Sequence, residues 1–137
     1  MRLPKALILF VTIFFLTALA AAAEEDRLVS TGVAPAAEGK VVTNVDRNGN
    51  IEVEVQVKHL ASADKLTPAK QTYFVWVQGR GKDPEPLGTL RVNENLEGSV
   101  KATTPYKTFD VFVTAEDNMK PATPSSMVVL RGSVDRK

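Results

Sequence analysis

The chain has 137 residues, of which 17 are basic and 16 acidic, and it contains no cysteine. The absence of cysteine excludes disulfide bonds and the thioether-linked lipid anchor of bacterial lipoproteins, so the folded part must be held together by ordinary burial. Basic and acidic residues are interspersed, and the net charge is close to zero. This balance gives no electrostatic reason to expect nucleic acid as a partner.

The first 23 residues have the layout of a secretory signal peptide. Arg2 and Lys5 precede an uncharged run from Ala6 to Ala23, which closes in alanines and is followed by three acidic residues. We therefore predict a signal helix over residues 1–23 and an extracytoplasmic location, periplasmic or secreted, for the rest. The small residues at the end of the run favour cleavage, but its 18 residues are close to the bilayer-spanning minimum, so a retained membrane anchor is the alternative.

The residues after the signal segment are enough for one domain. They include 15 basic and 16 acidic residues, a formal charge of −1. Residues 24–38 are mixed in charge, rich in alanine and without a period, which predicts a flexible arm. Residues 39–137 carry strand-like patterns and are expected to form the folded domain.

A β-hairpin is predicted at the start of this domain. Apolar and polar residues alternate strictly over positions 51–58, and the turn signal Asn48-Gly49 separates them from an earlier, shorter alternation. A three-residue loop ending at Asn50 sets Val45 opposite Val53 and keeps the buried face continuous. This register predicts that Asn50 adopts a left-handed backbone conformation.

Further strands are expected at intervals typical of a sandwich, at residues 71–78, 87–92, 99–104, 109–116 and 127–132. The segment 59–66 has room for only one or two helical turns before Pro68. The chain is therefore predicted to be all-β, an antiparallel immunoglobulin-like β-sandwich of about seven strands that follows the signal helix. A barrel is the alternative architecture.

Two of these strands carry large apolar side chains on both faces. One face, with Tyr73, Val75, Val77, Phe109, Val111 and Val113, is expected to form the core. The opposite face carries Phe74, Trp76 and Phe112 beside polar neighbours. Either the chain's own arm or loops cover these three aromatics, or Trp76 points into the core, or the three residues form a partner-contact surface.

The stretch from Tyr73 to Leu130 resembles the extracytoplasmic domain of anti-sigma-K factors. The resemblance rests on Tyr73-x-x-Trp76-Val77, Leu87-Gly88-x-Leu90, the run from Phe109 to Glu116, Pro124-Ser125 and Val128-Val129-Leu130. It implies the fold of that outer domain and a non-catalytic role in sensing or docking. Only five residues precede the apolar run, so no region able to hold a sigma factor is expected, and the anti-sigma activity is not carried over.

The residues give little sign of catalysis. His59 is the only histidine and is expected at a strand end, and no serine has a nucleophile-elbow setting. Residues 46–50 have the wrong spacing for a calcium loop, and Gly79-Arg80-Gly81-Lys82 lacks the Ser or Thr of a phosphate-binding loop and is predicted to be a hairpin tip. We therefore expect no catalytic residue, no cofactor and no metal site.

The functional expectation is a non-enzymatic module that binds another, unidentified envelope protein through its aromatic sheet face. Contact with the membrane is expected only if the signal segment is retained, and the oligomeric state stays open. The alternative is a small-ligand or glycan-binding domain that uses loop residues such as Tyr106 and Arg80.

Overall fold

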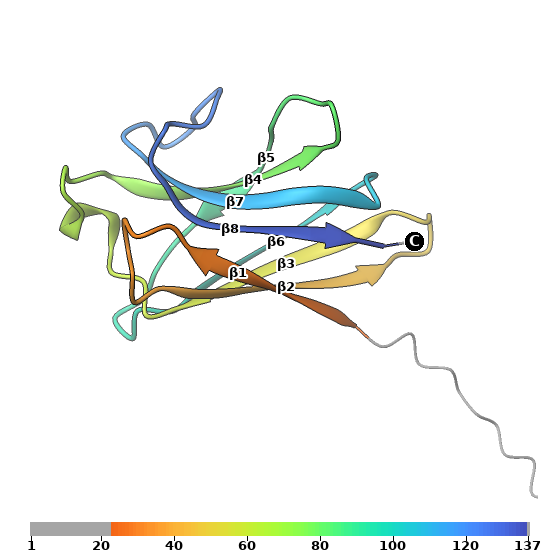
Figure 1. Ribbon diagram of the computed structural model, residues 1–137, viewed down its shortest axis with the longest axis horizontal. Coiled ribbons are helices and arrows are strands. Elements are labelled where there is room, and N and C mark those ends of the chain that lie inside the picture. Colours follow the sequence, from red (N-terminus) through yellow and green to blue (C-terminus); the bar gives the residue numbers. More distant parts are fainter. Residues whose placement is uncertain (1–22, 137) are drawn as a thin grey trace, which may run out of the picture.

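The computed structural model describes residues 23–136, so the predicted signal helix lies, except for Ala23, outside the described residues. Eight antiparallel strands follow one another in this part of the chain (Figure 1). The strands are β1 (Glu24–Ser30), β2 (Glu38–Val45), β3 (Ile51–Lys58), β4 (Thr72–Gly79), β5 (Glu85–Leu90), β6 (Gly98–Thr104), β7 (Thr108–Glu116) and β8 (Val128–Asp135). The only helical element in this range is a single 3-10 turn, Ala63–Lys65. The predicted all-β class is confirmed, with eight strands in place of about seven.

The strands form one nearly closed sheet in the order β5-β4-β7-β8-β1-β2-β3-β6. The two end strands approach each other closely without joining in a ladder. A Cβ placed on Gly88 of β5 would lie 2.9 Å from the Cγ2 atom of Val100 on β6. The strands therefore enclose a common core, with an open seam between β5 and β6.

The first strand is the largest departure from the sequence-based prediction. Residues 24–38 were expected to form a flexible arm, but Glu24–Ser30 forms β1, which pairs first with β2 and then, through Val29 and Ser30, with β8. Leu28 is the only fully buried side chain of β1. Because β1 is held by backbone pairing and one apolar side chain, its sequence shows no alternation of apolar and polar residues that would indicate a strand.

In the hairpin between β2 and β3, the same residues of each strand face the core as predicted, but the residue pairs across the hairpin differ. Val45 lies opposite Ile51 and not opposite Val53, so the buried face is continuous but shifted by two residues. The side chain of Asp46 causes the shift, because its Oδ1 accepts the backbone N–H groups of Asn48 (2.8 Å) and Asn50 (2.9 Å). Gly49, with φ +79°, takes the left-handed conformation that was predicted for Asn50.

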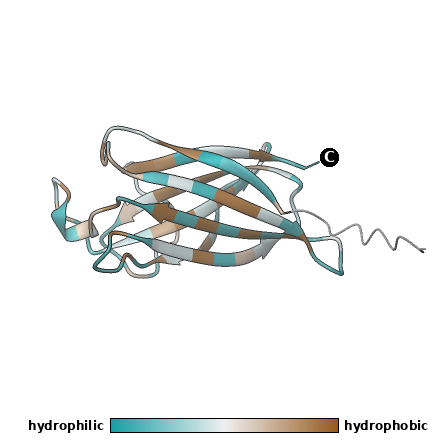
Figure 2. Ribbon diagram, turned by 90° about the horizontal axis from the view of Figure 1, so that it is seen from below, coloured by the Kyte–Doolittle hydropathy of each residue, from teal (hydrophilic) through white to brown (hydrophobic). Residues whose placement is uncertain are grey.

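The main core lies between the β1-β2-β3-β6 half of the sheet and the β5-β4-β7-β8 half. Apolar and polar bands alternate along the strands (Figure 2), and the alternating residues of β3 place their valines inside as predicted. The predicted inner faces of β4 and β7 are also confirmed. Their members in the core are Tyr73, Val75, Val77, Phe109, Val111 and Val113.

Tyr73 brings a polar group into this core. Its ring is 2% exposed, and its hydroxyl donates a hydrogen bond to the carbonyl oxygen of Ala61 at 2.7 Å. Burial, with a smaller contribution from the negative charge of Asp64, raises the pKa of Tyr73 to about 12.

This pKa predicts a loss of stability at high pH. Between the ordinary tyrosine pKa of about 10 and the folded value of about 12, the unfolded chain loses the phenol proton while the folded chain keeps it. The contribution of Tyr73 to the free energy of unfolding should therefore be constant and fully present below about pH 10, and it should be lost as the pH rises towards 12. Urea unfolding measured across this window checks the expectation. Tyr73→Phe should reduce the slope, and an unchanged slope in this variant would contradict the assignment.

Candidate functional site

The candidate site is the outer face of β4, β7 and β8, which points away from the main core. The strand register aligns side chains across this face in rows, with Gln78, Asp110 and Ser133 in one row and Trp76, Phe112 and Arg131 in the next. The face therefore divides into a polar part near the β4–β5 turn and an aromatic part near the β7–β8 connection.

The aromatic part is a second apolar cluster, separate from the main core. It consists of Phe74, Trp76 and Phe112, with Val128 packed against them. The rings of Phe74 and Trp76 lie 5.0 Å apart and are tilted by 47°. The guanidinium of Arg131 lies 6.0 Å from the centre of the Phe112 ring. The prediction that the three aromatics share the face opposite the core is thereby confirmed.

These aromatics are largely covered by the chain. Phe74 is 8% exposed, Phe112 is 7% exposed, and Trp76 is completely buried. This burial agrees with the expectation that the chain itself covers them, and Trp76 lies outside the main core cluster. Their role as partner contacts stays a prediction.

A chain of hydrogen bonds ties the aromatic cluster to the β7–β8 connection. The indole Nε1 of Trp76 donates to Oγ1 of Thr114 (2.8 Å), which donates to Oε1 of Glu116 (2.6 Å). The same carboxylate oxygen accepts the backbone N–H of Ser125 (2.8 Å), and the hydroxyl of Ser125 donates to the carbonyl oxygen of Ala115. Glu116 is buried, so these bonds satisfy a carboxylate that would otherwise destabilise the fold.

Sequence reasoning missed this network. The signal that could have indicated it is the spacing of Phe112, Thr114 and Glu116, since alternate residues of a strand share one face. The contribution of Ser125 carries no such signal, because it depends on how the connection folds back.

The polar part of the outer face contains an open depression of about 470 Å³. Both of its carboxylates are held by hydroxyl groups: Ser133 donates to Oδ1 of Asp110 (2.7 Å), and Thr108 donates to Oδ1 of Asp135 (2.9 Å). Arg80, from the tip between β4 and β5, also lines the depression. We call this hollow the polar depression; its polar lining is Gln78, Arg80, Thr108, Asp110, Ser133 and Asp135.

The structure separates the two residues proposed for ligand binding. Arg80 lines the polar depression, whereas Tyr106 does not. The ring of Tyr106 lies against Gly79, where a Cβ would be 3.0 Å from two ring carbons, and its hydroxyl donates to Oε1 of Glu85 at 2.7 Å. This hydrogen bond raises the pKa of Tyr106. Tyr106 thus connects the β6–β7 turn to the end of β4 and the start of β5.

The remaining sequence candidates lie apart from the outer face. His59 is exposed and follows β3 with φ +56°, as expected for a strand-end histidine. The segment from Gly79 to Lys82 forms the predicted hairpin tip. Within residues 23–136, no three or more His, Cys, Asp or Glu side chains gather in a way that could hold a metal ion.

The opposite side of the molecule offers a weaker candidate. The outward side chains of β1, β2, β3 and β6 are mostly polar or charged, and ion pairs such as Lys40–Glu25 (3.4 Å) and Lys101–Glu52 (3.0 Å) link neighbouring strands. These exposed pairs contribute little to stability and are typical of a solvated surface. The outer face of β4, β7 and β8 therefore has the more unusual composition.

Comparison with known proteins does not assign the chain to a family. No protein-family model matches it, and the searches of curated proteins and of solved structures found no significant match. Over residues 23–136, the structure contains no helix with the length and apolar character needed to span a membrane.

Proposed function

We propose that this protein is an exported, non-catalytic module that binds another protein of the cell envelope through the outer face of β4, β7 and β8. The observation that carries the proposal is the aromatic cluster, which is separate from the main core and adjoins an open polar depression. We further propose an immunoglobulin-like sandwich architecture, with β1 shared between its two layers.

Sequence features support export and a role without catalysis. The basic start, apolar run and alanine-rich end of residues 1–23 are typical of a signal peptide. The resemblance of residues 73–130 to the outer domain of anti-sigma-K factors favours sensing or docking over chemistry. The chain also has a single histidine and no cysteine, which are common sources of catalytic bases and nucleophiles.

The geometry suggests how the outer face would bind. Phe74 and Phe112 keep a small exposed area on this face, so they can form the apolar floor of an interface. Trp76 has no exposed area and would act by holding this floor rigid. Arg131, Asp110 and Ser133 surround the floor with groups that can pair with a polar partner surface.

Charge reversal at the edge of the aromatic cluster tests the proposal. In Arg131→Glu, we expect affinity for the envelope partner to fall by about tenfold or more, because a charge that contacts the partner is reversed. The thermal midpoint should change little, since exposed substitutions usually alter stability by less than about 0.5 kcal/mol. The partner is recovered from the envelope with the tagged exported chain, purified and titrated against each variant.

The matched control is Lys58→Glu, a reversal of the same kind at the exposed end of β3 on the other side of the molecule. Equal affinity of the wild type and both variants would show that the partner does not bind the outer face. Equal loss in both variants would point to a general effect of charge and would also contradict it.

The polar depression favours a second candidate, a small-ligand or glycan-binding function. Its carboxylates, hydroxyls and the Arg80 guanidinium are groups that hydrogen-bond to sugars and other polyols. A sugar that raises the thermal midpoint of the wild type but not of Arg80→Ala would favour this function over protein contact.

A further inference from the structure

A single leucine holds β1 in the sheet. The side chain of Leu28 fills a slot between Gly39 of β2 and Gly132 of β8. A Cβ on Gly39 would lie 3.0 Å from Cβ of Leu28, and a Cβ on Gly132 would lie 2.7 Å from its Cδ2. The two glycines therefore leave a space that the leucine side chain occupies. The other residues of β1 are exposed or partly exposed.

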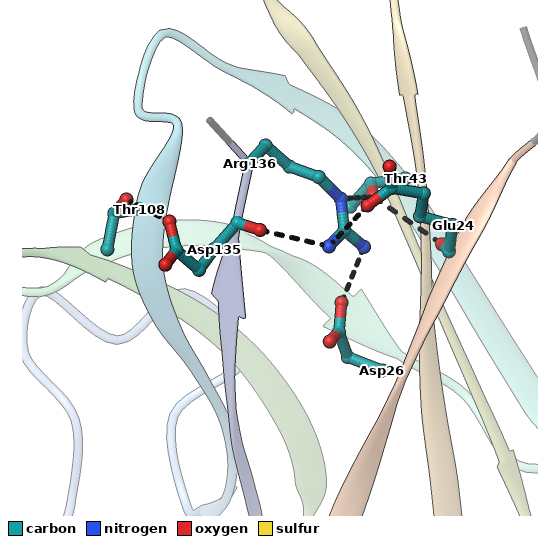
Figure 3. Close-up of polar contacts among 6 residues, drawn as sticks. All are labelled: Glu24, Asp26, Thr43, Thr108, Asp135 and Arg136. Carbon is teal, nitrogen blue, oxygen red and sulfur yellow. Dashed lines mark hydrogen bonds and ion pairs between the residues drawn. The ribbon is translucent and has the colours of Figure 1, made fainter.

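The start of β1 is held by a second device, the Arg136 clamp. The guanidinium of Arg136 pairs with Glu24 (2.8 Å) and Asp26 (2.5 Å), and its Nε donates to Oγ1 of Thr43 at 2.7 Å (Figure 3). The backbone N–H of Arg136 donates to the carbonyl oxygen of Lys107. Since the Arg136 side chain is only 13% exposed, these charge-assisted contacts are partly shielded from water.

The two devices make β1 resemble a bound peptide more than an internal strand. Arg136, which directly follows β8, contacts Glu24 and Asp26, and the glycines of β2 and β8 accommodate Leu28. β1 divides its pairing between β2 and β8. The connection to β2 includes Gly32, whose φ is +95°. Val29, near the end of β1, and Val33, within this connection, are 63% and 39% exposed.

We propose that β1 is an exchangeable strand, and that a second copy of this chain inserts its own β1 between β2 and β8 to form a reciprocal dimer. Every contact of the slot and the clamp is reproduced in the exchanged form. The exposed valines at the connection favour the dimer, because two connections that cross can bury them against each other. This inference stands independently of the proposed partner-binding function.

Cysteine pairs across the ladder test the exchange. Glu25 and Val42 lie directly opposite each other on β1 and β2, at a separation suited to a disulfide. The chain has no other cysteine, so Glu25→Cys with Val42→Cys gives a single possible bond. The reduced variant is incubated at low and high concentration and then oxidised. Because exchange places the two cysteines of each pair on different chains, the disulfide-linked dimer should increase with concentration.

The matched control keeps the same cysteine on β2. Val42→Cys with Glu54→Cys joins β2 to β3, which do not exchange, so this pair should form bonds within one chain at every concentration. Arg27→Cys with Lys40→Cys provides a second β1–β2 reporter in case the first variant folds poorly. Only intramolecular bonds in the β1–β2 reporters, or equal dimer in the control, would overturn the proposal.

Removing the clamp should change the rate of exchange but not its endpoint. Arg136 makes its contacts in both the monomer and the exchanged dimer, so Arg136→Ala weakens both forms equally. Release of β1 should become about tenfold faster or more, while the equilibrium fraction of dimer is unchanged. Lys101→Ala, which breaks an ion pair between β6 and β3, should leave the rate unaltered. No acceleration in Arg136→Ala would show that the clamp does not hold β1.

Discussion

Replacing Trp76 with alanine is expected to lower the free energy of unfolding by about 3–5 kcal/mol, the range typical of large aromatic residues in well-packed sites. The indole has no exposed area and packs against Phe74 on the outer face of the sheet. The substitution also removes the indole N–H that donates a hydrogen bond to Oγ1 of Thr114. This loss weakens the hydrogen bonds that continue to Glu116 and Ser125. The variant therefore loses both the apolar packing of the indole and its hydrogen bond to Thr114.

Chemical denaturation of the wild type and the variant measures this effect. Trp76→Phe keeps an aromatic ring but loses the Nε1 donor and part of the indole volume, so it should cost less than the alanine variant. Val45→Ala, at an exposed position, should change stability by less than about 0.5 kcal/mol. A loss below about 1 kcal/mol in Trp76→Ala would show that the outer cluster is not packed as described.

The second large effect is expected at Gly132 of β8. A Cβ at this position would lie 2.6 Å from the carbonyl oxygen of Arg27 and 2.7 Å from Cδ2 of Leu28. Because a backbone oxygen cannot move away alone, Gly132→Ala should push β1 out of its place. We expect a loss of about 2–4 kcal/mol, comparable to losing the buried leucine.

Gly88→Ala is the matched control, since the new methyl group would meet only the side chain of Val100, at 2.9 Å. Its effect should be smaller, because a side-chain methyl can shift more readily than a neighbouring strand. Urea unfolding gives the two free energies, and hydrogen exchange should show faster exchange in β1 for Gly132→Ala. Equal losses in both variants with β1 still protected would falsify this account.

The strands that were predicted well are those with a strong local pattern. Strict alternation in residues 51–58 gives β3, and the two-faced apolar runs give the central strands β4 and β7. β1 escaped detection because Leu28 is its only buried side chain, and part of its support comes from Gly132 and Arg136, about a hundred residues away. No local window of the sequence can contain that information.

The candidate site was also predicted only in part, because local patterns show which residues share a face but not which distant residues cover them. Alternation placed Phe74, Trp76 and Phe112 on one face opposite the core, as the structure confirms. Their burial depends on distant groups such as Val128, which packs against the cluster. Likewise, the depression beside them forms only where the register brings Asp110 next to Ser133. Pattern gives the face of a side chain, but long-range pairing decides what covers it.

The ion pair between Glu24 and Arg136 has a further consequence for how the domain can be joined to other polypeptides. Strand β1 begins and β8 ends at the same pole of the molecule (Figure 1). A short linker could therefore join the end of β8 to the start of β1, and new ends could be opened in a surface turn elsewhere. By the same geometry, the domain could be inserted into a loop of a host protein, because its two ends would require only a narrow gap in the host backbone.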